Sequence, residues 1–188
     1  MKRLTFLLST KQKFESKPLK TLFWQYSTLN SLMRFQLKFQ KCLVKDVRAK
    51  NPTVGVIGLG PVGSILAAHL AGSGVDVVVE DALPNVLLKV KQDGITVSGI
   101  TKLTAKIGKI ANTISELAEF EPEVVFIVTK ACYLKDIIPE IKQVYTPKMK
   151  VVSFQNGLDN ERFIVEQLGI DTAYRIVINF AGNLVSPG

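Results

Sequence analysis

The stretch TVGVIGLGPVG, residues 53–63, places a glycine-rich turn between an apolar run and a segment with the composition of a helix. Residues 53–57 are predicted to form a buried parallel strand, and residues 64–73 (SILAAHLAGS) the helix that follows. In a G-x-G-x-x-G turn, the first glycine permits the sharp bend. The second lets the backbone approach a pyrophosphate, and the third lets helix and strand pack closely. This order of elements predicts an α/β fold.

The same turn is the first candidate binding site. Phosphate groups bind the unpaired N–H groups at a helix N-terminus, where the helix dipole favours negative charge. A proline suits the first helical position, because the N–H that it lacks has no helical partner there. A purely structural glycine turn is the alternative, but a second strand ending in an acid follows and favours a dinucleotide. The predicted cofactor-binding residues are Gly58, Leu59, Gly60, Pro61, Val62 and Gly63.

The positive charge of the chain belongs to its N-terminal part. Residues 1–50 carry 12 Lys and Arg against 2 Asp and Glu, and residues 51–188 carry 12 against 14, so that +10 and −2 sum to the net +8. We therefore expect a basic N-terminal extension, 1–50, and a dinucleotide-binding domain, 51–188. Cys42 and Cys132 have no metal-ligand spacing, which suits a reducing compartment. No apolar run approaches the roughly 20 residues that span a bilayer, so a soluble, cytoplasmic protein is expected.

Three interpretations of the extension stay open. The first is a disordered leader, or sequence upstream of a true start at Met33. The second is a transit peptide, which would make the protein mitochondrial. The third is an amphipathic arm, with Phe35, Phe39 and Leu43 at helical spacing, that binds nucleic acid or a membrane surface. We prefer the first, so neither nucleic acid nor a membrane is an expected partner.

Strands and helices alternate from residue 51 onward, which predicts a doubly wound, mainly parallel sheet with helices on both faces. Further strands are expected at residues 75–79, 124–128, 150–154 and 174–178, and a hairpin-like excursion at 95–97 and 105–110. Helical spacing joins Leu83, Leu87 and Val90, and again Leu134, Ile137, Ile138 and Ile141. A further helix is expected to be capped by Asp159, to run to Leu168 and to end at Gly169.

Ligands of such sheets bind beyond the carboxyl ends of the strands, so the residues there are candidates. Glu80 lies 22 residues after Gly58, where a carboxylate commonly binds ribose hydroxyls and disfavours a 2′-phosphate; a solvated strand end is the alternative. Lys130 could reach a phosphate or polarise a carbonyl, or be an ordinary surface lysine. Asn156 offers a donor and an acceptor to a ligand, or simply forms a turn with the glycine that follows.

The single histidine and the second cysteine are not expected to act in chemistry. His69 lies two helical turns beyond the glycine loop and is interpreted as structural. Cys132 has no histidine near it in sequence and is interpreted as a small apolar residue. No metal site is predicted.

Four stretches together resemble one known family. They are GLGPVGSILAAHLAGSG, VVFIVTKACYLKDII, VVSFQNGLDNERFI and YRIVINFAGNLVSPG. In this order and at these distances they are similar to the N-terminal half of ketopantoate reductases (2-dehydropantoate 2-reductases), over about residues 53–188. The glycine loop is shared with many dehydrogenases, whereas the Thr-Lys-Ala and Gln-Asn-Gly-Leu blocks are far more specific.

The resemblance implies a Rossmann domain that binds NADPH and reduces 2-dehydropantoate to pantoate, within pantothenate and coenzyme A synthesis. It implies that the loop from Gly58 to Gly63 holds the pyrophosphate and that Lys130 contacts the cofactor. It also implies that Asn156 lies near the nicotinamide and the substrate, and that Ala181 and Gly182 approach the cofactor. The implied partner is a small 2-oxo acid, and a homodimer stays an open partner.

The sequence departs from the family pattern in two places. Many relatives carry a basic residue after the second strand to hold the 2′-phosphate of NADP, whereas this chain has Glu80 and Asp81, which favour NAD. The resemblance implies a helical C-terminal domain that supplies the catalytic lysine, and we expect this chain to lack it. No catalytic residue is therefore predicted within this chain. The expected function is NADPH-dependent reduction of 2-dehydropantoate by a truncated chain, with NAD possible because of Glu80 and Asp81. The alternative is a non-catalytic NAD(P)-binding module.

Overall fold

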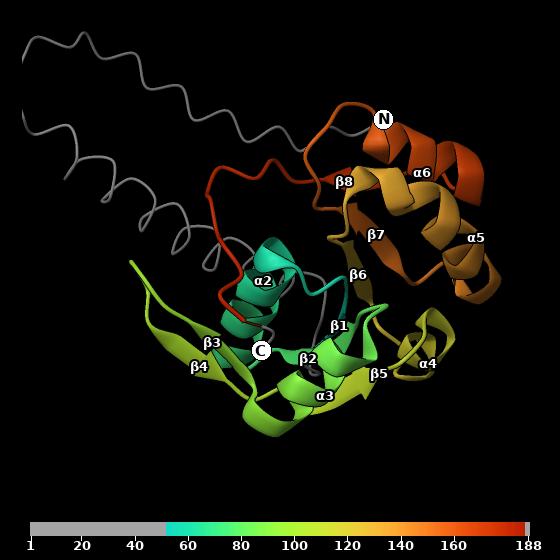
Figure 1. Cartoon of the computed structure of the whole chain (residues 1–188). Helices are drawn as coiled ribbons and strands as arrows, with labels where there is room; N and C mark the ends of the chain where they lie inside the picture. The colour runs from blue at the N-terminus through green and yellow to red at the C-terminus, as the bar shows by residue number, and fades with distance from the viewer. Residues whose placement is uncertain (1–51, 187–188) are drawn as a thin grey trace, which may run out of the picture.

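The computed structural model describes residues 52–186, so the predictions for the basic extension lie outside the described residues. Figure 1 shows one α/β domain with helices on both sides of a twisted sheet. In chain order its elements are β1 (Thr53–Ile57), α2 (Pro61–Gly72), β2 (Asp76–Glu80), α3 (Pro84–Asp93), β3 (Ile95–Val97), β4 (Leu103–Ala105), β5 (Lys109–Ala111), α4 (Ile114–Glu119), β6 (Val124–Ile127), the 3₁₀ turn η1 (Ala131–Tyr133), α5 (Leu134–Val144), β7 (Lys150–Ser153), α6 (Asn160–Leu168) and β8 (Tyr174–Arg175).

Within the described residues, six parallel strands form the main sheet, in the order β5-β2-β1-β6-β7-β8. The chain builds outward from β1 in one direction and then returns to build from β6 in the other. Ile57 is therefore flanked by Glu80 on one side and Ile127 on the other. The crevice where strand order reverses is where doubly wound sheets bind their ligands, and here it opens at the carboxyl ends of β1 and β6.

Side chains of a strand alternate between the two faces of the sheet, and here both faces are buried. One core packs α2, α3 and the β3–β4 hairpin against strand residues that include Val56, Val79, Phe126 and Val152. The other packs α4, α5 and α6 against Ile57, Val78, Ile127 and Val151. The expected doubly wound sheet is confirmed, and strands buried on both faces explain the nearly continuous apolar runs.

The excursion after α3 differs from the prediction. A hairpin does form, but β3 pairs with residues 103–105 rather than with the whole of 105–110. Residues 109–111 instead join the main sheet as β5, parallel to β2. Alternation of apolar residues runs through both segments, so it does not mark where the chain leaves one sheet for the other. Helix α4 was not predicted, because its six residues are too few to show apolar spacing at i, i+3, i+4 and i+7. Thr113 caps it by accepting from the Glu116 N–H at 3.1 Å.

Three element ends also differ. Helix α2 begins at Pro61 rather than at residue 64, so the last part of the glycine motif is already helical. Strand β8 is two residues long rather than five. The residue before α6 is Asp159 as expected, but its φ of 61° is left-handed and its side chain makes no capping hydrogen bond, so that cap was wrong. Gly169, with φ of 69°, ends the helix as predicted.

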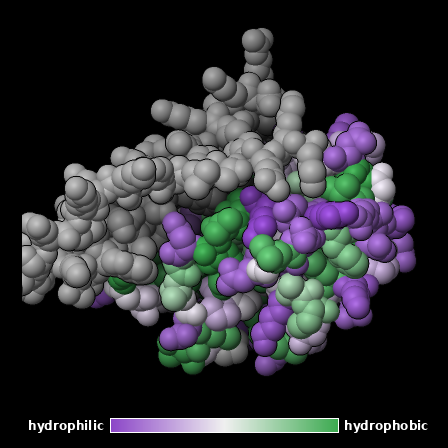
Figure 2. All heavy atoms as spheres, turned by 90° about the horizontal axis from the view of Figure 1, so that it is seen from above, coloured by the Kyte–Doolittle hydropathy of each residue, from purple (hydrophilic) through white to green (hydrophobic). Residues whose placement is uncertain are grey.

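The surface of the described domain is mixed. Figure 2 shows hydrophobic patches lying between hydrophilic ones on the face turned to the viewer. Large exposed apolar side chains include Leu158 and Val177, near the β7–β8 edge of the sheet. In the described part of the chain, no helix has the length and apolar character needed to cross a membrane.

Candidate functional site

The glycine loop lies between β1 and α2, in the crevice where strand order reverses. Gly58 has φ of +95°, and a Cβ placed on it would lie 2.7 Å from the Thr129 methyl group. A Cβ on Gly63 would lie 1.9 Å from the Gly58 carbonyl oxygen. Only glycine therefore lets the loop turn this sharply and lets α2 pack this close to it.

The remaining glycine of the motif, Gly60, faces open space. A Cβ on Gly60 would meet no other heavy atom of the described residues within 4 Å. The first turn of α2 has no acidic residue, and the N–H groups of such a turn have no partner inside the helix. Ser64 fixes the loop from the other side, because its hydroxyl donates to the Leu59 carbonyl at 2.9 Å. An open, positively polarised turn of this kind fits a pyrophosphate.

The two acids after β2 occupy different places. The Asp81 carboxylate accepts from the Leu59 N–H at 2.6 Å and from the Leu83 N–H at 2.9 Å, so it lies directly on the glycine loop. The Glu80 side chain is buried, with 8% exposure, and shares the face of Val78. Burial, together with the negative charges of Asp81 and Glu140, raises the pKa of Glu80 to about 7. Assignment of Glu80 to a ribose stays a prediction, and the geometry favours Asp81.

The segment after β6 lies beside the glycine loop. Thr129 leaves no room for a Cβ on Gly58, and its carbonyl and hydroxyl oxygens accept from the Gln155 amide at 2.7 and 3.3 Å. The Gln155 side chain is buried and also accepts from the Ser153 hydroxyl at 3.2 Å. Lys130 follows at the start of η1 with an exposed side chain. Gln155 thus ties the end of β7 to the end of β6, beside the loop.

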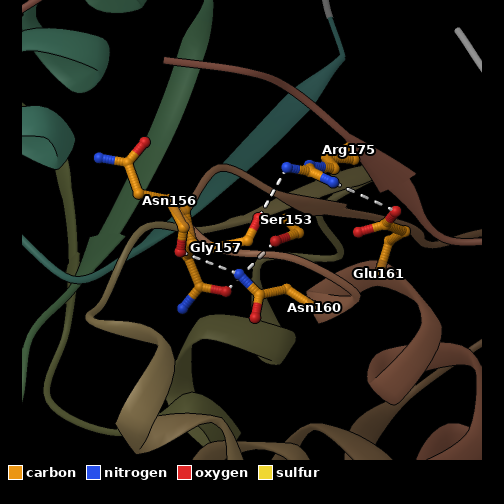
Figure 3. A network of polar contacts seen from close by, with 7 residues as sticks. Ser153, Asn156, Gly157, Asn160, Glu161 and Arg175 are labelled. Carbon is orange, nitrogen blue, oxygen red and sulfur yellow. Dashed lines mark hydrogen bonds and ion pairs between the residues drawn. The ribbon is translucent and has the colours of Figure 1, made fainter. Parts of the chain in front are cut away.

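The Asn156–Gly157 turn continues from that bridge. Figure 3 shows the exposed Asn156 side chain pointing away from the polar groups that hold the turn. Gly157 has φ of +125°, which glycine adopts without strain. The turn leads into α6, as one interpretation from the sequence expected. It also leaves the exposed Asn156 amide at the carboxyl end of β7, where ligand binding stays a prediction.

The segment after β8 returns to the glycine loop. A Cβ on Gly182 would lie 2.6 Å from the Ile65 Cδ1 atom and 3.9 Å from the Pro61 carbonyl oxygen. Gly182 therefore passes over the first turn of α2, where a larger residue would displace the end of the Ile65 side chain, while Ala181 is exposed. In Figure 1 this segment runs from β8 back past α2.

His69 and Cys132, which were not expected to act in chemistry, lie in different parts of the domain. His69 is in the last turn of α2, and partial burial lowers its pKa, which suits the structural role expected for it. Cys132, interpreted from the sequence as a small apolar residue, is exposed on η1 rather than packed in a core.

The predicted residues from β1, β6, β7 and the segment after β8 gather at one end of the sheet. Three contacts there escaped prediction: Asp81 on the Leu59 N–H, the Gln155 bridge to Thr129, and an arginine that binds the Gly157 carbonyl. For Asp81 a signal existed, because it directly follows Glu80 at the predicted strand end. For Arg175 the signal is weak: it is the one charged residue in the apolar run YRIVI.

This sheet order, with a glycine loop between β1 and the next helix, defines a class: the dinucleotide-binding domain of Rossmann-type, NAD(P)-dependent oxidoreductases. The family model described as ketopantoate reductase PanE/ApbA matches residues 54–188. The chain belongs to the ketopantoate reductase PanE/ApbA family. The resemblance noted from the sequence is thereby confirmed.

Solved structures with the same fold include two of this family and one neighbour. A PanE/ApbA family ketopantoate reductase from Ralstonia eutropha JMP134 has a TM-score of 0.60 and 18% identity, covering 72% of this chain and 44% of that one. A 2-dehydropantoate 2-reductase from Methylococcus capsulatus has a TM-score of 0.56 and 21% identity, covering 72% and 43%. D-mandelate dehydrogenase in complex with NADH has a TM-score of 0.60 and 20% identity, covering 72% and 42%.

The chain thus spans less than half the length of these proteins. No curated protein matches it.

Proposed function

We propose that the carboxyl ends of β1, β2, β6 and β7 bind a nicotinamide dinucleotide, and that this site serves the reduction of a 2-oxo acid. The observation that carries the proposal is the glycine loop. Gly63 admits no Cβ beside the Gly58 carbonyl, whereas Gly60 faces open space at the N-terminus of α2. This combination supports a turn shaped for the close approach of a pyrophosphate.

The residues around the loop suggest roles for the remainder of the coenzyme. Asp81 is the acid placed to bind the hydroxyls of the adenosine ribose, because its carboxylate already lies on the Leu59 N–H. Lys130 is exposed at the end of β6, within reach of solvent-facing phosphates. Asn156 presents a free amide to the nicotinamide end, and Gly182 lies over the first turn of α2.

We further propose that NADH is preferred to NADPH. An acid on the loop, with no basic residue between it and Lys89, repels a 2′-phosphate and accepts hydrogen bonds from a free ribose. This departs from the NADPH preference that the family resemblance implied. It rests on Asp81 rather than on Glu80, whose carboxyl is buried on the face of Val78.

The substrate that family membership supports first is 2-dehydropantoate. The bound coenzyme would supply the hydride for its ketone. Negative charge then builds on the ketone oxygen, so a positioned donor is needed. Within residues 52–186 we assign no side chain to that task. Asn156, as a hydrogen-bond donor beside the nicotinamide end, would orient the substrate rather than protonate it.

The test begins with binding. Titration of the full chain with NADH or NADPH, followed by coenzyme fluorescence, is expected to show saturable binding that Gly60→Asp weakens at least tenfold. Gly108→Asp, at a glycine outside the loop whose Cβ would also meet no heavy atom within 4 Å, is the matched control. Equal affinities for the wild type and Gly60→Asp would reject the site.

The second step adds 2-dehydropantoate and follows loss of the reduced coenzyme. Turnover would support the reductase assignment. Coenzyme binding without turnover would support the non-catalytic module that the sequence left as the alternative.

A further inference from the structure

Side chains hold both carbonyl groups of the Asn156–Gly157 turn. The Asn160 amide donates to the Asn156 carbonyl at 3.2 Å, and the Arg175 guanidinium donates through Nη2 to the Gly157 carbonyl at 2.6 Å (Figure 3). Asn160 is buried, and its Nδ2 would lie 3.2 Å from a Cβ on Gly157. The main chain of the turn is therefore held from two sides, and the Asn156 side chain projects from a fixed base.

The guanidinium is itself placed by two elements. Arg175 pairs with Ser153 in the sheet, and the next N–H, of Ile176, donates to the Ser153 carbonyl at 3.0 Å. Glu161, in the first turn of α6, lies with Oε1 3.7 Å from Arg175 Nη1, and both side chains are less than a third exposed, at 26% and 29%. Strand β8 and helix α6 together direct the guanidinium at the Gly157 carbonyl.

This ion pair is incompletely satisfied. Glu161 Oε2 and Arg175 Nε are buried, and neither has a hydrogen-bond partner among the described residues. Buried polar atoms without hydrogen-bond partners cost stability, and a partly exposed ion pair contributes little to it. Arg175 does form one short hydrogen bond, to the Gly157 carbonyl. We therefore expect the arginine to act mainly on the conformation of the turn, and less on the stability of the sheet edge.

We infer that Arg175 is a positioning residue for Asn156. Arg175 holds the Gly157 carbonyl, Glu161 orients the guanidinium, and the turn then directs the Asn156 amide at the nicotinamide end of the coenzyme. The inference rests on the proposed function, in which Asn156 contacts that end. Arg175 itself touches neither coenzyme nor substrate.

The test compares two ligands that differ in the nicotinamide. The full chain is titrated with NADH and with ADP-ribose, which contains the same adenosine and pyrophosphate but no nicotinamide; NADPH and 2′-phospho-ADP-ribose replace them if they bind more tightly. Arg175→Met should weaken binding of the reduced coenzyme by about two- to thirtyfold, the usual range for residues that act through a neighbour. Its affinity for ADP-ribose should stay within about twofold.

The matched control is Arg162→Met on α6. Like Arg175→Met it removes one positive charge, but it breaks only the exposed pair with Glu166. It should leave both affinities unchanged. Glu161→Gln serves as the second variant if Arg175→Met folds poorly, as judged by circular dichroism, and should cause a smaller loss with the same selectivity. In the double variant Asn156→Ala with Arg175→Met, the loss should not exceed that of Asn156→Ala alone, because Arg175 acts through that amide.

Two results with the variants would overturn the inference, and one result with the wild type would overturn it together with the proposed function. Equal losses for the reduced coenzyme and for ADP-ribose would make Arg175 a general support of the fold. A loss in the double variant equal to the product of the two single losses would separate Arg175 from Asn156. If the wild type bound neither ligand, the proposed coenzyme site would be rejected and the inference with it. If the wild type bound both and the variants kept its ratio of reduced-coenzyme affinity to ADP-ribose affinity, only the inference would be rejected.

Discussion

The carboxylate of Asp81 accepts a hydrogen bond from the backbone N–H of Leu59 at 2.6 Å, across 22 positions of sequence. This contact places a negative charge on the glycine loop itself, at the edge where the adenosine ribose of a dinucleotide lies in doubly wound sheets. The acid and the loop therefore act as one unit in coenzyme choice.

Replacing Asp81 by Asn should shift coenzyme preference toward NADPH. The Asn oxygen can still accept from the Leu59 N–H, so the loop keeps its shape while the charge is lost. Removing a repulsion of about 1 kcal/mol from a 2′-phosphate corresponds to roughly a fivefold change in the ratio of NADPH to NADH affinity. Fluorescence titration with both coenzymes measures that ratio. Asp93→Asn, at an exposed acid paired with Lys89 on α3, should leave it unchanged; an equal shift in both variants would indicate a general charge effect.

The two glycines of the loop should respond differently to alanine. A Cβ on Gly63 would meet the Gly58 carbonyl oxygen at 1.9 Å, so α2 must move away from β1. We expect Gly63→Ala to lower the free energy of unfolding by about 1–3 kcal/mol, or more. A Cβ on Gly60 meets open space, so Gly60→Ala should change stability by about 0.5 kcal/mol or less, yet weaken coenzyme binding. Urea unfolding and coenzyme titration separate the effects, and a destabilised Gly60→Ala would contradict this geometry.

Glu80 should make stability depend on pH. Its pKa is about 7 in the folded domain against an ordinary value of 4.5. Between these two values the folded state holds the extra proton, so this contribution to stability is complete below about pH 4.5 and is lost as the pH rises through 7. The full difference is up to about 3 kcal/mol.

Glu80→Gln keeps a neutral side chain at every pH and should remove this decline. Burial lowers the pKa of His69, which produces the opposite trend, so the difference between variant and wild type isolates Glu80. Urea unfolding between pH 4.5 and 8 measures both proteins, with Glu119→Gln at an exposed position of α4 as the control. Parallel curves for wild type and Glu80→Gln would show that this carboxyl is not responsible.

Lys130→Ala should weaken coenzyme binding without altering stability. The side chain is exposed, so it makes no core contact, and an exposed lysine–phosphate contact contributes up to about 1 kcal/mol, or roughly a two- to fivefold change in affinity. The gap between wild type and variant should narrow as ionic strength rises. Lys135→Ala, an exposed lysine on α5, is the control. A gap that does not depend on salt would argue against a phosphate contact.

Local pattern sufficed to predict most of the fold. Strands such as β1 and β6 are buried on both faces, so their apolar runs stand out, and the glycine loop marks the β1–α2 junction. The place of β5 was not predictable in this way, because its pairing with β2 joins segments more than 30 positions apart. The apolar pattern of such a segment is the same in either sheet.

In the candidate site, too, some residues could be predicted from local pattern and others depend on how the strands pair. Residues at strand ends, such as Lys130 and Asn156, follow from the rule that ligands bind at that edge. The choice between Glu80 and Asp81 depends on which face of the sheet each side chain takes, and a shift of one residue reverses it. The contact of Arg175 with Gly157 depends on the register of β8 against β7, which no local motif encodes.

The register of β1 with β6 has a consequence for synthesis of the protein. Val54 pairs with Val124, so one edge of the central strand waits for a partner 70 positions later in translation. At about 5–20 residues per second, a ribosome needs roughly 4–14 seconds to supply it. During that interval a hydrophobic β-edge is exposed on the nascent polypeptide, a template for pairing with other chains. Holding by a chaperone until β6 has been synthesised would protect this edge from such pairing.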